Sequence, residues 1–307
     1  MPESHSCSLS LKEISVGQRV AWANLSQGIA SEISLTTAKE FILWSDNEQQ
    51  SFLQALSTEI VVPREILDSI PPLPLETEAV LAYGSRARGD SVEESDLDLL
   101  VVSSAGGPNL KSGKVSVAVY TEEELRKSSG TLFGYHLRRD SLCIHDPAQK
   151  LQNIIENLGE VDTARVFSRA KHLGKILMGG DSDIQQYLPG LYREARYLLR
   201  SCLYAKAISE GEPCFSVRIL ADRYGQPRFA DLLSAQPKDT SSIDDYFFCR
   251  QHLSEVLGGI ERNDHGTLEA LIVNEWYNDS DLISMGLMAL GDIDNIGDYA
   301  EVKAVFL

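Results

Sequence analysis

The chain contains an Asp-Leu-Asp segment, residues 96–98, that follows the pair Gly84 and Ser85 after ten intervening residues. Side chains alternate across a strand, so Asp96 and Asp98 are expected on one side of it and Leu97 on the other. Two carboxylates this close repel each other and resist burial unless a cation or hydrogen-bond donors compensate them, and a divalent ion is the simplest explanation. Mg²⁺ and Mn²⁺ prefer such hard oxygen ligands. The pattern therefore predicts a divalent metal site at Asp96 and Asp98.

The Gly-Ser pair predicts a phosphate-binding turn. Gly84 permits a tight turn and a close approach of the backbone, and Ser85 offers a hydroxyl and an N–H group at the start of a short helix. A phosphate group fits at such a helix start. Arg86 and Arg88 lie in the first turn after Ser85, and each is interpreted either as a phosphate contact or as a surface residue.

Short apolar segments surround both motifs. Residues 79–83 and 97–102 are rich in Val and Leu and are bounded by turn-forming or charged residues, which predicts two buried strands. Residues 114–120, KVSVAVY, predict a further strand, and residues 142–145 predict a last short one. Residues 122–137 are expected to be helical. These elements would hold the two motifs at one edge of a sheet.

Together, these residues resemble the DNA polymerase β-like nucleotidyltransferases, in particular the prokaryotic minimal and kanamycin nucleotidyltransferase-like types. The resemblance spans about residues 75–149. It implies an α+β fold, with a nucleotidyltransferase-like mixed sheet and flanking helices. It also implies that Gly84 and Ser85 bind the triphosphate of an NTP and that Asp96 and Asp98 bind metal. The implied reaction moves NMP to a hydroxyl of a protein, an RNA or a small molecule and releases pyrophosphate.

The chain departs from this family at one position. Family members usually supply a third carboxylate from a later strand. Neither face of residues 114–120 carries an acid, and the acids of residues 122–124 are explained by the charge preference at a helix start. Either the acid comes from elsewhere, or one metal suffices, or catalysis is weak or lost. In the last case the protein would bind nucleotide as a regulatory protein, including as a member of a toxin-antitoxin or phage-defence pair.

The length predicts more than one domain. A chain of 307 residues with 43% hydrophobic residues can form two cores. We expect an N-terminal extension of uncertain fold at residues 1–70, in which residues 37–56 form one or two short helices. A proline-rich connector then opens the catalytic domain, residues 71–149. Residues 150–307 are expected to form an all-helical domain with an acidic end.

Three arginines in the predicted helical domain share one helix face. Arg193, Arg196 and Arg200 are spaced by three and four residues. A planar guanidinium suits bidentate phosphate contact, so these arginines are predicted to line a cleft and bind triphosphate or a phosphate-bearing acceptor. The alternative is a solvated face whose arginines pair with acids such as Glu194.

Charge and composition restrict the partners. The net charge of −17 disfavours a broad electrostatic grip on nucleic acid. Residues 239–307 contain fourteen Asp and Glu residues but three Lys and Arg residues, which predicts either a solubilising surface or a docking surface for a basic protein. Five widely spaced cysteines indicate reduced thiols. Without an 18-residue apolar stretch, the chain is expected to be cytoplasmic and to have no membrane partner.

Overall fold

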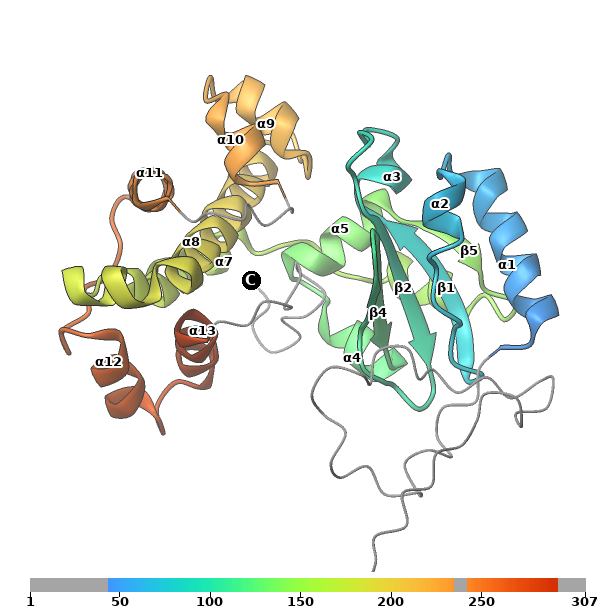
Figure 1. Cartoon of the computed structure of the whole chain (residues 1–307), viewed down its shortest axis with the longest axis horizontal. Helices are drawn as coiled ribbons and strands as arrows, with labels where there is room; N and C mark the ends of the chain where they lie inside the picture. Colours follow the sequence, from blue (N-terminus) through green and yellow to red (C-terminus); the bar gives the residue numbers. More distant parts are fainter. Residues whose placement is uncertain (1–43, 235–241, 292–307) are drawn as a thin grey trace, which may run out of the picture. The chain divides into compact units, whose positions relative to one another are not determined.

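The computed structural model describes residues 44–234 and 242–291, which form two compact units (Figure 1). The first, here called the sheet unit, contains the described residues up to Gly89 together with residues 93–122 and 142–152. The second, the helical unit, contains residues 90–92, 123–141 and the described residues from 153 onward. The units alternate along the chain, whereas the sequence predicted consecutive domains.

The sheet unit is built on a mixed five-stranded sheet with the strand order β3-β4-β2-β1-β5. The central strand β2 pairs antiparallel with β1 and parallel with β4, and β3 and β5 lie at the two edges. The predicted strands are all present, and β3 is an addition to them. The strands are β1 (Thr77–Tyr83), β2 (Leu97–Ser103), β3 (Leu110–Ser112), β4 (Val115–Tyr120) and β5 (Leu142–His145).

Two helices that precede the sheet in sequence cover one of its faces. Helix α1 (Asp46–Glu59) starts with a capping box between Ser45 and Glu48 and lies beside β5 (Figure 1), and α2 (Arg64–Leu67) follows it. Their buried side chains share a hydrophobic core with Leu97, Leu99 and the other apolar residues of that face. Residues 44–70, which the sequence assigned to an extension of uncertain fold, therefore complete the core of the sheet unit. Residues 1–43 lie outside the described part.

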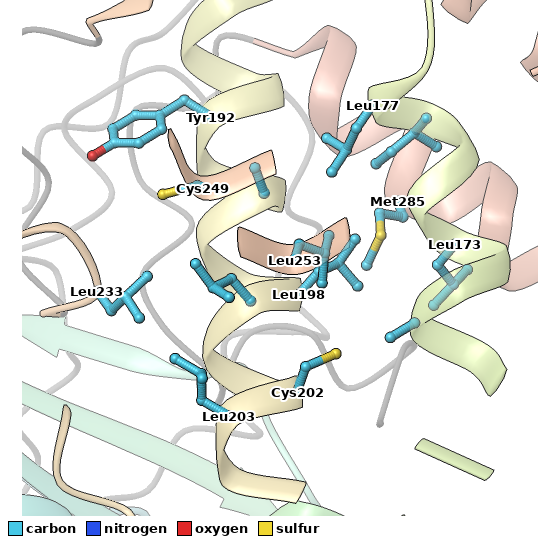
Figure 2. Close-up of a cluster of buried hydrophobic side chains, with 14 of the residues drawn as sticks. Leu173, Leu177, Tyr192, Leu198, Cys202, Leu203, Leu233, Cys249, Leu253 and Met285 are labelled. Carbon is cyan, nitrogen blue, oxygen red and sulfur yellow. The ribbon is translucent and has the colours of Figure 1, made fainter. Parts of the chain in front are cut away.

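The helical unit packs its helices around a long central helix. Helix α8 contacts α7, α11 and α13, and Figure 2 shows Leu198, Leu253 and Met285 among the apolar side chains of its core. The helices of this unit, the first and third of which begin in the sheet unit, are α4 (Glu122–Lys127), α5 (Leu132–Asp140), α6 (Lys150–Glu156), α7 (Thr163–Leu173), a 3₁₀ helix (Gly174–Leu177), α8 (Asp181–Ser209), α9 (Val217–Arg223), α10 (Arg228–Leu232), α11 (Ile243–Leu257), α12 (Leu268–Glu275) and α13 (Ser280–Leu290).

The helix α8 runs through a Pro-Gly pair that by sequence separates two helices. It bends at Tyr187, whose backbone is not helical, and Pro189 follows inside the helix. Gly190 lies so close to α13 that a Cβ atom there would be 2.0 Å from the Ala289 carbonyl oxygen. The predicted α+β class, with a mixed sheet and a helical C-terminal region, is confirmed. Among the described helices, none combines the length and apolar character needed to cross a bilayer.

Candidate functional site

The two aspartates of the predicted metal site lie where β2 begins. Leu97 is fully buried in the core, while Asp96 and Asp98 on either side of it are partly exposed. This alternation agrees with the expectation that Leu97 faces the core beneath α1 and that Asp98 belongs to the opposite face. A carboxylate on that face keeps access to solvent and to ligands, which a carboxylate at position 97 would not have.

The glycine of the predicted phosphate turn touches one of these aspartates. Gly84 has a φ of +78°, a backbone conformation that residues with a side chain rarely adopt. A Cβ atom at this position would lie 2.4 Å from Oδ2 of Asp98, much closer than atoms can approach. The register explains the approach, because Tyr83, at the end of β1, pairs with Asp98. The turn after β1 and the carboxylate on β2 are therefore brought together by strand pairing.

A single short helix follows this turn. Helix α3 (Gly84–Arg88) contains the partly exposed Ser85 and ends at Gly89, which has a φ of +76°. Arg88 is partly buried on the same helix. Ser85 thus lies one residue beyond the turn that touches Asp98, where its hydroxyl group can serve a ligand bound at that turn.

Arg86 of α3 has a partner that the sequence analysis did not identify. Its side chain is buried, and its Nε and Nη2 atoms donate hydrogen bonds to the Ser95 carbonyl oxygen at 3.1 and 2.6 Å. Ser95 directly precedes Asp96. The guanidinium therefore supports the backbone from which the first aspartate projects, and the burial of Arg86 contradicts the surface role considered from sequence.

Asp98 and its paired residues on the neighbouring strands form a row across the sheet. Asp98 pairs with Tyr83 of β1 on one side and with Ser116 of β4 on the other, and Ser116 pairs in turn with Lys111 of β3. Paired residues project from the same face of a sheet. The position beside Asp98 on the strand expected to supply a third carboxylate is thus occupied by Ser116.

Lys111 lies on strand β3, which was not among the strands predicted from the sequence. The signal was Gly113 directly before the predicted strand segment, because a glycine in this position is typical of a two-residue hairpin turn. The structure has this hairpin, in which Ser112 pairs with Val115 and Gly113 has a φ of +56°.

Two of the three acids that follow β4 form ion pairs. Glu122 lies 3.6 Å from the ammonium nitrogen of Lys150, and Glu123 lies 2.7 Å from that of Lys127. The hydrogen bond from Lys127 lowers the pKa of Glu123. These contacts agree with the interpretation of both acids as helix-terminal charges.

The three arginines predicted to bind phosphate make contacts within the helical unit. Arg193 donates to the Met288 carbonyl oxygen of α13 and to Glu194, at 2.9 Å for the latter. Arg196 donates to carbonyl oxygens at the end of α10, those of Leu232 and Ser234. Arg200 is buried, and one of its Nη atoms lies 3.4 Å from another carbonyl oxygen at that end. All three guanidinium groups thus bind the C-terminal ends of neighbouring helices.

Described acids of the predicted acidic end also have intramolecular partners. They include Asp245 with Arg228, Glu255 with His252, Glu261 with Lys175 and His172, Glu269 with Tyr187, Glu275 with His265, Asp279 with His172, and Asp281 with Arg169. The pairs with Arg and Lys compensate part of the negative charge inside the helical unit, which weakens the case for a surface that awaits a basic partner.

The residues at the start of β2 suit a divalent cation that also binds phosphate. Within the described ranges, no group of three or more His, Cys, Asp or Glu side chains is arranged to hold a metal ion. Asp96 and Asp98 nevertheless fit Mg²⁺ or Mn²⁺, because Mg²⁺ is commonly bound by one or two carboxylates with substrate phosphates completing its shell. The close approach of Gly84 to Asp98 places a phosphate-binding type of turn beside this pair.

Part of the chain matches a family model of a known domain. Residues 64–144 match the family model described as "Nucleotidyltransferase domain". A search of curated proteins gave no match. Among solved structures, a nucleotidyltransferase-like protein from Exiguobacterium sibiricum 255-15 is similar at 15% sequence identity and a TM-score of 0.29, over 74% of this chain and 80% of that one.

Proposed function

We propose that the chain, whose residues 64–144 match the family model of a nucleotidyltransferase domain, is an enzyme of the polymerase β-like type that transfers NMP from an NTP to a hydroxyl group and releases pyrophosphate. The acceptor is a protein, an RNA or a small molecule. The proposal assigns the reaction to the end of the sheet where the turn at Gly84 meets β2.

Each residue of this end has one proposed role. Asp96 and Asp98 hold Mg²⁺ or Mn²⁺, and a bound ion would supply neutralisation of phosphate charge. The backbone at Gly84 and the hydroxyl of Ser85 orient the β- and γ-phosphates. Arg86, through its hydrogen bonds to the Ser95 carbonyl, keeps Asp96 in place.

The proposed transfer is a single in-line displacement. The acceptor oxygen forms a bond to the α-phosphorus while the bond from this phosphorus to the bridging oxygen breaks. That oxygen leaves with the bonding electrons as part of pyrophosphate, and the proton of the acceptor hydroxyl passes to solvent. The residues of the site contribute by holding the triphosphate in the reactive orientation.

One observation carries the proposal, namely the contact between the turn at Gly84 and the carboxylate of Asp98. A Cβ atom at residue 84 would lie 2.4 Å from Oδ2 of Asp98, so a ligand held by the turn would also meet the carboxylate. A phosphate group alone would be repelled by a carboxylate at this distance. A cation between them removes the repulsion, and NTP bound with a divalent ion supplies both.

The test uses NTPs labelled at the α-phosphate. The full chain is incubated with each NTP, Mg²⁺ or Mn²⁺, and a cell extract, and the label is followed into protein, RNA and small molecules. We expect Asp96→Asn and Asp98→Asn to lower transfer by at least about 100-fold, because each removes a ligand charge. Glu94→Gln, which changes an exposed acid of the preceding loop, is the matched control and should transfer like the wild type. Full activity in both aspartate variants would contradict the proposal.

A second candidate function is nucleotide binding without transfer, as in a regulatory protein. The observation that favours it is Ser116, which occupies the position beside Asp98 where the related enzymes are expected to place an acid. A protein of this kind binds NTP with Mg²⁺ but releases no pyrophosphate with any acceptor. Measuring NTP affinity alongside pyrophosphate release therefore distinguishes the two functions.

A further inference from the structure

Lys111 belongs to the same row of the sheet as Asp98. It pairs with Ser116, which pairs with Asp98, so the row across β3, β4 and β2 reads Lys, Ser, Asp. Lys111 lies 13 positions beyond Asp98 in sequence, and strand register alone places the two in one row with Ser116 between them.

Alternation along β3 and β4 indicates on which face Lys111 projects. Leu110 packs against the core that lies beneath α1, and Val115 and Val117 are buried in it. Lys111 and Ser116 alternate with these residues, so they belong to the opposite face, where Asp98 lies. Lys111 is exposed, and Ser116 is partly exposed, which agrees with this assignment.

The spacing of the strands brings the lysine within range of a ligand at Asp98. Neighbouring strands lie about 4.8 Å apart, so the backbones at Asp98 and Lys111 are separated by about 10 Å across Ser116. A lysine ammonium is carried on a flexible four-carbon stem. A phosphate bound over Ser116 can therefore meet both the lysine and a cation held by the aspartates.

We propose that Lys111 is a phosphate-binding residue of this site and contacts the triphosphate of the bound NTP. This inference rests on the proposed function. Because residue 116 is a serine, this part of the row has no carboxylate to hold another cation. The lysine supplies positive charge there as part of the protein itself. The site then combines two carboxylates at one end of the row with an ammonium group at the other.

The test is calorimetric titration of the full chain with three ligands in the presence of Mg²⁺: ATP, inorganic pyrophosphate and AMP. We expect Lys111→Ala to weaken binding of ATP and AMP by about tenfold or more and to change pyrophosphate binding much less, because Gly84 and Ser85 hold the β- and γ-phosphates on the other side of Asp98 and the α-phosphate lies nearest to the lysine. Lys111→Arg keeps the charge and should bind within about threefold of the wild type. Lys127→Ala removes an exposed lysine that pairs with Glu123 and is the matched control.

The outcomes separate this inference from the proposed function. Unchanged ATP and AMP affinity in Lys111→Ala, with a loss in Asp98→Asn, overturns the role of Lys111 and leaves the proposed function standing. A wild type that binds no NTP of any base overturns both. A loss of affinity in Lys127→Ala equal to that in Lys111→Ala also overturns the inference, because the effect would then follow from net charge alone.

A charge placed inside the row gives a second test. Ser116→Asp inserts a carboxylate beside Lys111, and the resulting ion pair should weaken AMP binding in the wild-type background. In the Lys111→Ala background the same substitution has no ammonium to neutralise, so its effect should differ. Strict additivity of the two substitutions would argue against a shared phosphate site. Thermal unfolding of each variant checks that the sheet unit is intact.

Discussion

At the scale of single residues, two glycines at the ends of α3 provide a natural comparison. Gly84 and Gly89 have φ values of +78° and +76°, so an alanine would strain the backbone similarly at both positions. Their surroundings differ. A Cβ atom at Gly84 would collide with the carboxylate of Asp98, whereas a Cβ atom at Gly89 would have nothing within 4 Å. Substitution at the two sites therefore separates backbone strain from the contact with Asp98.

We predict that Gly89→Ala lowers the free energy of unfolding by about 1–2 kcal/mol and leaves NTP affinity unchanged. Gly84→Ala should lower the free energy of unfolding by more than this and should also abolish Mg²⁺-dependent NTP binding, because the carboxylate of Asp98 must move. Urea unfolding and calorimetric titration measure the two effects. Equal behaviour of the two variants would show that the contact with Asp98 has no part in binding.

Much of the residue-level site was predictable from sequence, and some of it was not. Gly84, Ser85, Asp96 and Asp98 were identified from spacing alone, because a turn and a two-residue alternation are local properties. The partner of Arg86 was not predictable. It is a backbone carbonyl nine residues away, and the path of the loop between them decides whether the guanidinium reaches it.

At the scale of elements, the arginines of α8 donate hydrogen bonds to backbone carbonyl groups at the ends of other helices. The last carbonyl groups of a helix have no partner within that helix, and a buried one is costly unless a donor reaches it. Arg193 reaches the end of α13, and Arg196 and Arg200 reach the end of α10. The helical spacing that suggested a phosphate-binding face therefore also suits the joining of three helices.

For Arg196→Ala we expect a loss of about 1–3 kcal/mol in the free energy of unfolding, since carbonyl groups of Leu232 and Ser234 lose a donor, and an unchanged affinity for NTP. Arg165→Ala, on the exposed side of α7, is the control and should leave both quantities unchanged. If NTP affinity falls while stability holds, the phosphate role predicted from sequence is correct for Arg196.

An acid-sensitive contact joins α7 to the start of α13. The ring nitrogens of His172 lie 3.0 Å from Glu261 and 2.6 Å from Asp279, and Asp279 also accepts hydrogen bonds from the first turn of α13. Burial opposes the charge on both carboxylates, but the hydrogen bonds outweigh it and lower the pKa of each. A lowered pKa means that the folded state binds fewer protons than the unfolded state, so stability is gained at higher pH.

The lowered pKa values of the two carboxyl groups predict how the contact responds to acid. The stabilisation by Glu261 and Asp279 is fully present above the ordinary carboxyl pKa of about 4 and is lost as the pH falls through the lowered values. Asp279→Asn should therefore be less stable than the wild type at pH 7, with a difference that shrinks below about pH 4. Urea unfolding across this pH range measures it, with the exposed Asp264→Asn as control. A constant difference at all pH values would contradict the electrostatic origin.

At the scale of the whole molecule, the described residues form two hydrophobic cores without a shared member. One lies between the sheet and the helices α1 and α2, and the other surrounds α8. Each unit therefore has the interior that independent folding needs. Ligand that binds the native form of one unit stabilises that unit by mass action.

We predict two unfolding transitions in calorimetry, one for each unit. Saturating NTP with Mg²⁺ should raise the temperature of the transition of the sheet unit. Leu56→Ala should lower the free energy of unfolding of the sheet unit, and Leu198→Ala that of the helical unit, each by about 2–5 kcal/mol. Both side chains are fully buried, and they belong to separate cores. A single transition that both substitutions shift equally would show that the two units unfold together.

The sequence by itself determined the motif, the strands around it, the helical character of the C-terminal region and the absence of an acid on β4. These properties follow from side-chain spacing over a few residues, which local geometry converts into structure. Tertiary structure alone decided that Gly84 touches Asp98, that Ser116 and Lys111 continue the row of Asp98, and that the arginines of α8 bind helix ends. These contacts depend on strand register and helix packing, which join residues that are distant along the chain.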